Sequence, residues 1–566
     1  MTRRVTWCTH GLVIKCQADV GFYARIHPVR AHAEVIHKQI PNSLVNTIMT
    51  IQQNTKVIDH SHFLIDGKLE AWNGSRAQVW SPITDDQGER ILLGSTPDLP
   101  SEEGMKALEA AKSAYDHGRG TWPTAPAADR IAAMEKFIEL MVPKRDEVVN
   151  LLMWEICKKR SDAEKEFDRT VTYLRETIDE YKNLHREGSH IMSVDGTLAQ
   201  IRRGPIGVVL CLGPFNYPLN ETFCVLLPAL LMGNTCVFKP AKYGVLLITP
   251  LLEAFAQSFP PGVVNIIFGR GRTLASPIMQ TGHIDVLALI GNSKSSNALI
   301  SQHPKPNRVR QVLGLEAKNP AVIFPDADID LAVKECVKGA WSFNGQRCTA
   351  LKVIYVHKDI RDAFLKAFAA ATDALEWGSP FDNADITPLP EVGKVGYMQD
   401  YVNEAVEAGA RVVNERGGQV EGNLFFPAIL HPVSRDTAIF KEEQFGPVCP
   451  VLDFEDFEEV LTDIAESDYG QQVSIFTRDA QIAGQCIDHM VNQVCRVNIN
   501  ASCQRGPDTL PFTGRKDSAV ATLSVKAALR SFSIRTLVAC SQNQKDLVEE
   551  VIAGGHSSFS SMNYLL

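Results

Sequence analysis

The chain has 566 residues, of which 45% are hydrophobic and 22% charged, and its formal net charge at pH 7 is -9. This composition is typical of a globular protein, and the length is enough for about two to four domains. The charges are interspersed and slightly acidic in balance, so we expect no nucleic-acid partner and no polybasic membrane anchor. The best apolar run, near residues 224–232, contains Pro228 and is too short to span a bilayer, which predicts no membrane partner.

Cysteine usage indicates a reducing compartment. The 13 cysteines are scattered singly, with no Cys-x-x-Cys pair and no regular disulfide spacing. No cluster of histidines and cysteines has the spacing of metal ligands, so no metal is expected. These patterns favour a cytoplasmic protein.

The first fifty residues are compositionally unusual. Six basic side chains face only two acidic ones there, with little periodicity, which weakly resembles an organelle transit peptide. Two alternatives stay open, a poorly ordered extension and a start at Met49. We expect residues 1–58 to form an N-terminal extension of uncertain order.

The rest of the chain changes rhythm once. Between about residues 102 and 182, apolar residues recur at steps of three and four, which predicts helices. After residue 203, short apolar runs alternate with helix-length stretches, which is typical of parallel sheets in an α/β fold. The first series comprises IGVVLCLG, TCVFK, VVNIIF and VLALI, and the second AVIF, KVIYVH, CPVLDF, VSIFT and RVNIN. Two such series predict two doubly wound α/β domains, with ligands bound between them.

The most informative motif is Gly-Gln-Arg-Cys-Thr-Ala at residues 345–350. A single cysteine is usually structural, but this one lies in a connection between a helix and a strand. Gly345 permits tight backbone geometry there, and Arg347 is expected to favour a thiolate at Cys348. Cys348 is therefore the candidate nucleophile, and attack on an aldehyde would require fixed hydrogen-bond donors for the developing oxyanion.

Over roughly residues 60–540 the sequence resembles the aldehyde dehydrogenase superfamily, most closely its non-phosphorylating glyceraldehyde-3-phosphate dehydrogenase branch. Three further motifs carry the likeness, namely GPFNYPLN at 213–220, FKPAK at 238–242 and EEQFGPV at 442–448. The resemblance implies that Asn216 donates its amide to the oxyanion beside the Cys348 N–H. It also implies cofactor contacts for Lys239 at the adenosine ribose and for Glu443 and Phe445 at the nicotinamide end.

The cofactor preference follows from Lys242. Many members of this superfamily have a glutamate there, which repels a 2′-phosphate, whereas a lysine attracts it. We therefore expect NADP, with NAD as the alternative. The resemblance also places Gly291, Asn292 and Ser293 near the cofactor diphosphate, although Ser296 stands where the pattern has a glycine.

The substrate class rests on a basic constellation. By resemblance to the same branch, Arg169, Tyr217, Arg347 and Arg505 bind a substrate phosphate, and guanidinium groups suit that role. Each of these residues alone would more often be an ordinary surface or structural residue. Together they predict a small phosphorylated aldehyde as substrate.

One departure affects hydrolysis. Most superfamily members have a general-base glutamate in Glu-Leu-Gly-Gly-Lys, but the corresponding stretch here is GLEAK at residues 314–318. Gly314 occupies the glutamate position, and Glu316 is the nearest carboxylate. A two-residue shift in an extended segment keeps the same face, so Glu316 is the candidate base. Otherwise another group activates water, or another acceptor takes the thioester.

The resemblance implies a small β arm for oligomerisation. The apolar segment SFSIRTLVA, together with residues 191–202, corresponds to that arm, and an unpaired apolar edge is a liability. We expect a homodimer or homotetramer. The expected organisation is an extension at 1–58, a cofactor-binding domain at 59–190 and 206–312, a catalytic domain at 313–510, an oligomerisation arm at 191–205 and 511–542, and a disordered tail at 543–566.

The expected reaction is oxidation of glyceraldehyde 3-phosphate to 3-phosphoglycerate through a Cys348 thioester, without an acyl phosphate. The alternatives are a CoA-acylating or other semialdehyde dehydrogenase, and a catalytically weak family member that acts as a binding or structural protein. Retention of Cys348 and Asn216 argues against the last of these.

Overall fold

The computed structural model describes residues 58–85 and 87–561. The transit-peptide hypothesis, the extension and the alternative start at Met49 fall on residues before 58 and lie outside the described residues. Within the described ranges, no helix is long and apolar enough to cross a membrane.

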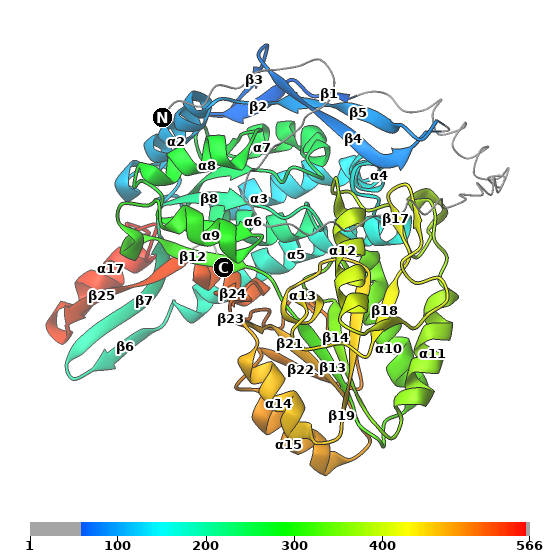
Figure 1. Cartoon of the computed structure of the whole chain (residues 1–566). Coiled ribbons are helices and arrows are strands. Elements are labelled where there is room, and N and C mark those ends of the chain that lie inside the picture. The colour runs from blue at the N-terminus through cyan, green and yellow to red at the C-terminus, as the bar shows by residue number, and fades with distance from the viewer. Residues whose placement is uncertain (1–57, 86, 562–566) are drawn as a thin grey trace, which may run out of the picture. The chain divides into compact units, whose positions relative to one another are not determined.

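The first large sheet has eight strands, and its central strands are the buried apolar runs that the sequence predicted (Figure 1). Neighbouring central strands are parallel, and the strand order reverses at β8, since β9 and β10 lie on one side of it and β11 and β12 on the other. In spatial order the strands are β24 (Ala519–Val520), β12 (Arg310–Gly314), β11 (Val286–Ile290), β8 (Val208–Leu212), β9 (Thr235–Lys239), β10 (Val264–Ile266), β2 (His62–Ile65) and β3 (Lys68–Ala71).

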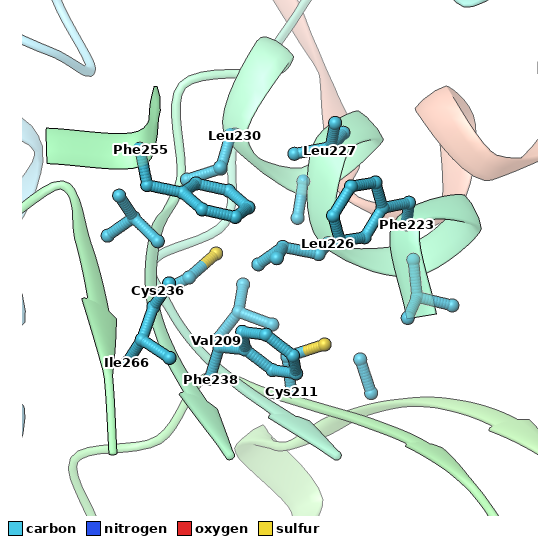
Figure 2. Packing of buried hydrophobic residues seen from close by; sticks show 14 of the residues in the cluster. Val209, Cys211, Phe223, Leu226, Leu227, Leu230, Cys236, Phe238, Phe255 and Ile266 are labelled. Carbon is cyan, nitrogen blue, oxygen red and sulfur yellow. The ribbon is translucent and has the colours of Figure 1, made fainter. Parts of the chain in front are cut away.

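Helices cover this sheet on both faces. Figure 2 shows Cys236 and Phe238 of β9 packed with Phe223 of α6 (Asn220–Leu231) and Phe255 of α7 (Leu252–Ser258). Helix α2 (Ser101–Tyr115) contacts β9 and β10 as well, and side chains alternate between the faces of a strand. Such strands are buried on both sides, which explains their uninterrupted apolar sequence.

The predicted helical region is confirmed as a series of separate helices, and a three-stranded sheet precedes it. That sheet consists of β1 (Ile58–Asp59), β5 (Arg90–Pro97) and β4 (Arg76–Thr84). The helices that follow α2 are α3 (Ala127–Met141), α4 (Arg145–Ile156) and α5 (Arg160–Glu187), and α8 (Gly271–Gln280) and α9 (Ser293–Ile300) come later in the chain.

The second large sheet has seven strands, and its predicted strands are likewise confirmed. Separate apolar clusters cover its two faces, one with α10 and α11 and the other with α12, α14 and α15. The strands in order are β15 (Arg411–Val412), β18 (Ala428–His431), β19 (Val448–Phe454), β14 (Leu351–His357), β13 (Asn319–Ile323), β21 (Gln472–Phe476) and β22 (Arg496–Ile499). The helices are α10 (Ile329–Trp341), α11 (Arg361–Asp373), α12 (Lys394–Glu407), α13 (Ala438–Lys441), α14 (Phe457–Glu466) and α15 (Ala480–Met490).

A three-stranded antiparallel arm completes the fold (Figure 1). Strand β7 (Thr197–Pro205) pairs with β6 (Ile191–Val194) on one side and with β25 (Ser533–Ser541) on the other. The expectation of a disordered tail is wrong for the segment that follows, which forms helix α17 (Lys545–Ala553). The helix lies against β25, and Ile552 is its buried residue.

Candidate active site

The cysteine loop joins α10 to β14. It passes through the short 3₁₀ turn Ser342–Gly345, whose second and third residues have φ of 50° and 56°. Gly345 itself has φ of 69°, and a Cβ at this position would lie only 2.7 Å from the Gly446 carbonyl oxygen. Glycine alone adopts this conformation without a clash, as the sequence predicted. The turn leaves Cys348 half-buried, whereas eight of the eleven cysteines in the described ranges are buried.

The Cys348 backbone is held by two side chains from the second sheet. Its carbonyl oxygen accepts hydrogen bonds from Asn319 Nδ2 at 2.7 Å and from Lys352 Nζ at 3.3 Å. Burial raises the pKa of the Cys348 thiol, and the nearby charge of Lys352 is the largest opposing effect, with smaller ones from Arg347 and a Gln471 hydrogen bond. The effect of burial on the thiol pKa therefore exceeds that of the nearby positive charges. Arg347 acts in the direction expected from the sequence, towards the thiolate, but its effect is smaller than that of burial.

Asn216 reaches the cysteine loop from the first sheet. It lies between β8 and α6, and its Nδ2 donates to the Gln346 carbonyl oxygen at 2.9 Å, two residues before the nucleophile. The side chain is buried, with 5% of the residue exposed. The fold thus brings together Asn216 and Cys348, which are far apart in the sequence, and the amide is at hand for an oxyanion formed there.

A buried ion pair holds the Asn216 turn. Lys158 Nζ donates to the Asn216 carbonyl oxygen at 2.7 Å and pairs with Glu166, and both charged side chains are fully buried. The other Glu166 oxygen accepts the N–H groups of Leu219 and Asn220, each at 3.1 Å, at the start of α6. Burial lowers the pKa of Lys158, and Glu166 opposes that effect. The pair therefore fixes the turn that carries the amide.

A second buried ion pair lies on the other side of the cysteine loop. Lys352 Nζ is 2.8 Å from Glu443 Oε1, and the same oxygen accepts the Ala317 N–H at 3.1 Å. Lys352 also lies 5.6 Å from the centroid of the Phe445 ring. The Phe445 ring packs edge-on against Phe215, from the loop that carries Asn216. Two residues of the predicted nicotinamide end, Glu443 and Phe445, thus lie close to the cysteine loop.

The predicted adenosine-side lysines lie at the carboxyl end of β9. Lys239 ends the strand, and burial lowers its pKa to about 8. Its Nζ donates to the Pro240 carbonyl oxygen at 2.6 Å. Lys242 is exposed, with its Nζ 5.0 Å from the centroid of the Tyr243 ring. This end of the sheet therefore carries two lysines, one of them open to solvent.

The predicted diphosphate segment forms the start of helix α9. Gly291 follows β11, and Asn292 caps the helix by accepting the Ser295 N–H at 2.8 Å. The Ser293 N–H is bonded to both Glu316 carboxylate oxygens, at 3.0 and 2.8 Å, and its hydroxyl donates to one of them at 2.7 Å. Glu316 was expected to activate water for the thioester at Cys348. Its carboxylate instead binds Ser293 at the start of helix α9.

Two of the predicted phosphate ligands are already paired with carboxylates. Arg169 makes a bidentate contact with Asp508 at 2.7 Å for both bonds. Arg505 pairs with Glu221 and with Asp508 and donates to the Leu523 carbonyl oxygen. The Arg169 side chain is 27% exposed and that of Arg505 only 5%. The two arginines and two carboxylates have no net charge, and only Arg169 borders solvent.

The other two predicted phosphate ligands lie nearer the nucleophile. Arg347 donates to backbone carbonyl oxygens of Ser342 and Gly339, at 3.2 and 2.8 Å, near the carboxyl end of α10. Tyr217 packs against Lys158, whose Nζ is 3.4 Å from the ring centroid. Burial raises the pKa of the Tyr217 phenol, and Arg347 and Arg169 are among the charges that oppose the rise. Tyr217 thus lies near the charges of Arg347 and Arg169. Arg169 shares Asp508 with Arg505, but the three arginines are engaged with protein atoms.

Sequence reasoning missed Lys158, Glu166 and Lys352. One signal was present, since Lys352 interrupts the apolar run ALKVIYV of a buried strand and Lys158 follows the apolar run LLMWEIC. A charged residue in such a run is almost always paired. The identity of the partner is a tertiary property and has no pattern in the sequence.

Comparison with known proteins agrees with this geometry. The model of the Aldehyde dehydrogenase family matches residues 72–538. The chain is 32% identical to the NADP-dependent glyceraldehyde-3-phosphate dehydrogenase of Streptococcus equinus, over 82% of this chain and 95% of the relative. It is 27% identical to the 3-sulfolactaldehyde dehydrogenase of Priestia aryabhattai, over 80% of this chain and 92% of that one.

Solved structures give the same result. The crystal structure of NADP-dependent glyceraldehyde-3-phosphate dehydrogenase from Bacillus halodurans C-125 complexed with NADP is 31% identical. It superposes with a TM-score of 0.79, covering 86% of this chain and 100% of that one. On the strength of the matched family, the shared fold and the cysteine–asparagine geometry, the chain belongs to the aldehyde dehydrogenase family.

Proposed function

We propose that the protein oxidises glyceraldehyde 3-phosphate to 3-phosphoglycerate with NADP, through a thioester on Cys348 and without an acyl phosphate. The observation that carries the chemistry is the Asn216 amide, 2.9 Å from the Gln346 carbonyl oxygen in the cysteine loop. The relatives named above support the substrate and the cofactor. A catalytically weak binding protein would have no need for a buried ion pair that holds this amide.

The residues at the carboxyl ends of β9 and β11, where the strand order reverses, fit a dinucleotide. Exposed Lys242 suits a 2′-phosphate, Lys239 lies beside it, and the α9 N-terminus suits a diphosphate. Glu443 and Phe445 lie between this region and Cys348 and are proposed to hold the nicotinamide end. When bound, NADP supplies the acceptor for the aldehyde hydride, and NAD is the alternative cofactor.

The proposed roles near the thiol follow from position. Cys348 attacks the aldehyde carbon as the thiolate and forms a thiohemiacetal, whose oxyanion is stabilised by Asn216 Nδ2 and the Cys348 N–H. After oxidation the acyl group remains on sulfur as a thioester. Water then attacks the carbonyl carbon, releasing 3-phosphoglycerate and the Cys348 thiol.

We propose Arg169 as the principal phosphate ligand, assisted by Tyr217 and Arg347. Arg169 is the more exposed of the two paired arginines, and its Nη1 is not used by Asp508. Arg505 was the fourth candidate, and it acts here through Asp508, which it shares with Arg169. A phosphate bound by Arg169 would orient the aldehyde carbon for attack by the thiolate.

A second candidate, a CoA-acylating dehydrogenase, is favoured by the position of Glu316. Gly314 offers no carboxylate, and Glu316 is held by Ser293. Hydrolysis of the thioester then depends on another base or on movement of Glu316, whereas transfer to a thiol acceptor requires neither.

We further propose a cytoplasmic homodimer or homotetramer. In this proposal the extension is 1–58, the cofactor-binding domain comprises 59–190 and 206–312, and the catalytic domain comprises 313–510. The oligomerisation arm is proposed to consist of β6, β7 and β25, because β24, which lies within the predicted range 511–542, belongs to the first large sheet.

The test is an aldehyde panel assayed with NADP and NAD, with product identification by mass spectrometry. We expect glyceraldehyde 3-phosphate to be preferred over unphosphorylated glyceraldehyde and to yield free 3-phosphoglycerate without added phosphate or CoA. Lys242→Glu should weaken NADP binding far more than NAD binding, because it places a like charge beside the 2′-phosphate. A requirement for CoA would establish the second candidate instead. A preference for 3-sulfolactaldehyde would show that the substrate carries a sulfonate and not a phosphate.

A further inference from the structure

The carboxylate of Glu316 occupies the N-terminus of helix α9. It accepts three hydrogen bonds from Ser293, two from the N–H at 3.0 and 2.8 Å and one from the hydroxyl at 2.7 Å. Glu316 comes from the loop between β12 and β13, and the Gly291 N–H fixes the start of that loop by donating to the Gly314 carbonyl oxygen at 2.9 Å. The donors are the neutral N–H and hydroxyl of Ser293, and the carboxylate brings a negative charge to this helix end.

Helix α9 begins where an α/β sheet of this topology binds a dinucleotide. The strand order reverses between β8 and β11, and ligands of such sheets bind beyond the carboxyl ends of the strands at that reversal. Helix α9 starts at the carboxyl end of β11. The N–H groups of its first turn and its helix dipole favour a negatively charged group such as a diphosphate, and the Ser293 N–H now binds Glu316 in that place.

The other helix at the reversal is closed to a ligand. At the start of α6, the N–H groups of Leu219 and Asn220 bind Glu166, and Glu166 pairs with Lys158. Both of these charged side chains are fully buried, so displacement of either one would leave the other charge buried without a partner. Glu316 is only half-buried, and among residues 58–85 and 87–561 its hydrogen-bond partner is Ser293. Of the two carboxylates, Glu316 is therefore the one that a ligand can displace.

We propose that Glu316 is an internal competitor of the cofactor diphosphate, so that this residue determines the affinity for the dinucleotide. The carboxylate of Glu316 and the cofactor diphosphate cannot both accept the N–H and hydroxyl of Ser293, and their like charges repel. Binding of the cofactor therefore requires release of Glu316. The inference rests on the proposed dinucleotide-dependent function.

The test is isothermal titration of NADP, and separately of NAD, into the full-length protein and into Glu316→Gln. Both dinucleotides carry the diphosphate, so the variant should bind each of them about tenfold more tightly, which is the effect of a single charged hydrogen-bonding partner. Adenosine 2′-monophosphate lacks the diphosphate, and its affinity should not change. Asp436→Asn removes an equal charge from a side chain that is 98% exposed, and it should bind all three ligands like the wild type.

Unchanged or weaker dinucleotide binding by Glu316→Gln overturns the proposal. So does an equal gain for adenosine 2′-monophosphate, because the effect would then be general electrostatics. Tighter binding of NAD alone, with no NADP binding by either protein, supports the role of Glu316 and overturns the proposed cofactor. If neither protein binds either dinucleotide, both the role of Glu316 and the proposed function are overturned. Glu316→Ala serves as a second variant, and circular dichroism checks that each variant is folded.

Discussion

At the scale of single residues, burial and nearby cations act in opposite directions on the Cys348 thiol. Burial raises its pKa, while Lys352 and Arg347 lower it to a smaller extent. Lys352 is itself paired with Glu443, whose negative charge also raises the thiol pKa. This balance leaves the pKa of the Cys348 thiol above its usual value. The attacking thiolate is then a minor species, and its population controls the rate of attack.

Cys348→Ser should abolish turnover, by roughly 10⁴-fold or more, because an unactivated hydroxyl is a poor nucleophile. In the wild type, the single-turnover rate should rise with pH up to and beyond the usual thiol pKa of about 8.5, since deprotonation creates the nucleophile and the pKa is raised. Stopped-flow measurement of NADPH formation checks both results. Cys495→Ser, at another partly exposed cysteine, is the control and should retain activity. A rate independent of pH across this range contradicts the protonated-thiol assignment.

Lys158→Met should lower the rate of the first turnover by about tenfold or more, because the Asn216 turn loses its hydrogen bond to the ammonium group. The same change leaves Glu166 buried without a partner and should lower the free energy of unfolding by about 3–5 kcal/mol. The double variant Lys158→Met/Glu166→Gln should recover part of that stability but not the rate. Lys159→Met, at a more exposed lysine paired with Asp385, is the matched control. Full activity in Lys158→Met would show that Asn216 keeps its position unaided.

At the scale of elements, the β arm combines an edge strand with exposed apolar side chains. Strand β25 is paired only with β7 in the described structure, and Leu537 on it is 59% exposed. Val194 on β6 is equally exposed at 59%. An edge of this kind is normally covered by another chain. The proposed oligomer would bury these residues.

Leu537→Asp should therefore reduce the oligomer to smaller species, because a charge has to be desolvated in the interface. Size-exclusion chromatography with light scattering measures the change in mass directly. Val392→Asp, at a side chain that is 73% exposed on another part of the chain, should leave the mass unaltered. An oligomer that withstands Leu537→Asp excludes this edge from the interface.

At the scale of the whole molecule, one charged cluster ties three distant segments together. Arg505 pairs with Glu221 of α6 and with Asp508, which lies three residues further along the same loop. Asp508 also pairs with Arg169 of α5. The cluster is neutral, and its deepest member is Arg505. This arrangement supports the proposal that Arg505 mainly stabilises the fold and that Arg169 binds the substrate phosphate.

Arg505→Met should lower the free energy of unfolding by about 3–5 kcal/mol, since it leaves Glu221 buried without its cation. Activity should fall alike for glyceraldehyde 3-phosphate and for glyceraldehyde. Arg169→Ala should instead raise the KM selectively for the phosphorylated aldehyde, because only that substrate loses a charged contact. Chemical denaturation and steady-state kinetics with both aldehydes distinguish the two roles. A selective loss for the phosphorylated substrate in Arg505→Met would return that arginine to the phosphate site.

The sequence by itself determined the fold class, because strands buried on both faces must be continuously apolar and their alternation with helices dictates parallel sheets. It also predicted the cysteine loop, since Gly345 has the positive φ that only glycine adopts freely. Motifs of this kind are local, and local sequence is enough to define them.

Only the tertiary structure decided how the charged groups are paired. Arg169 and Arg505 match a phosphate-binding pattern, yet Asp508 and Glu221 neutralise them in space. Likewise, the carboxylate of Glu316 reaches the start of helix α9 because β11, which precedes α9, and β12, which precedes Glu316, are neighbouring parallel strands. Electrostatic partners are set by distances between remote segments, and those distances are fixed only when the sheets pack together.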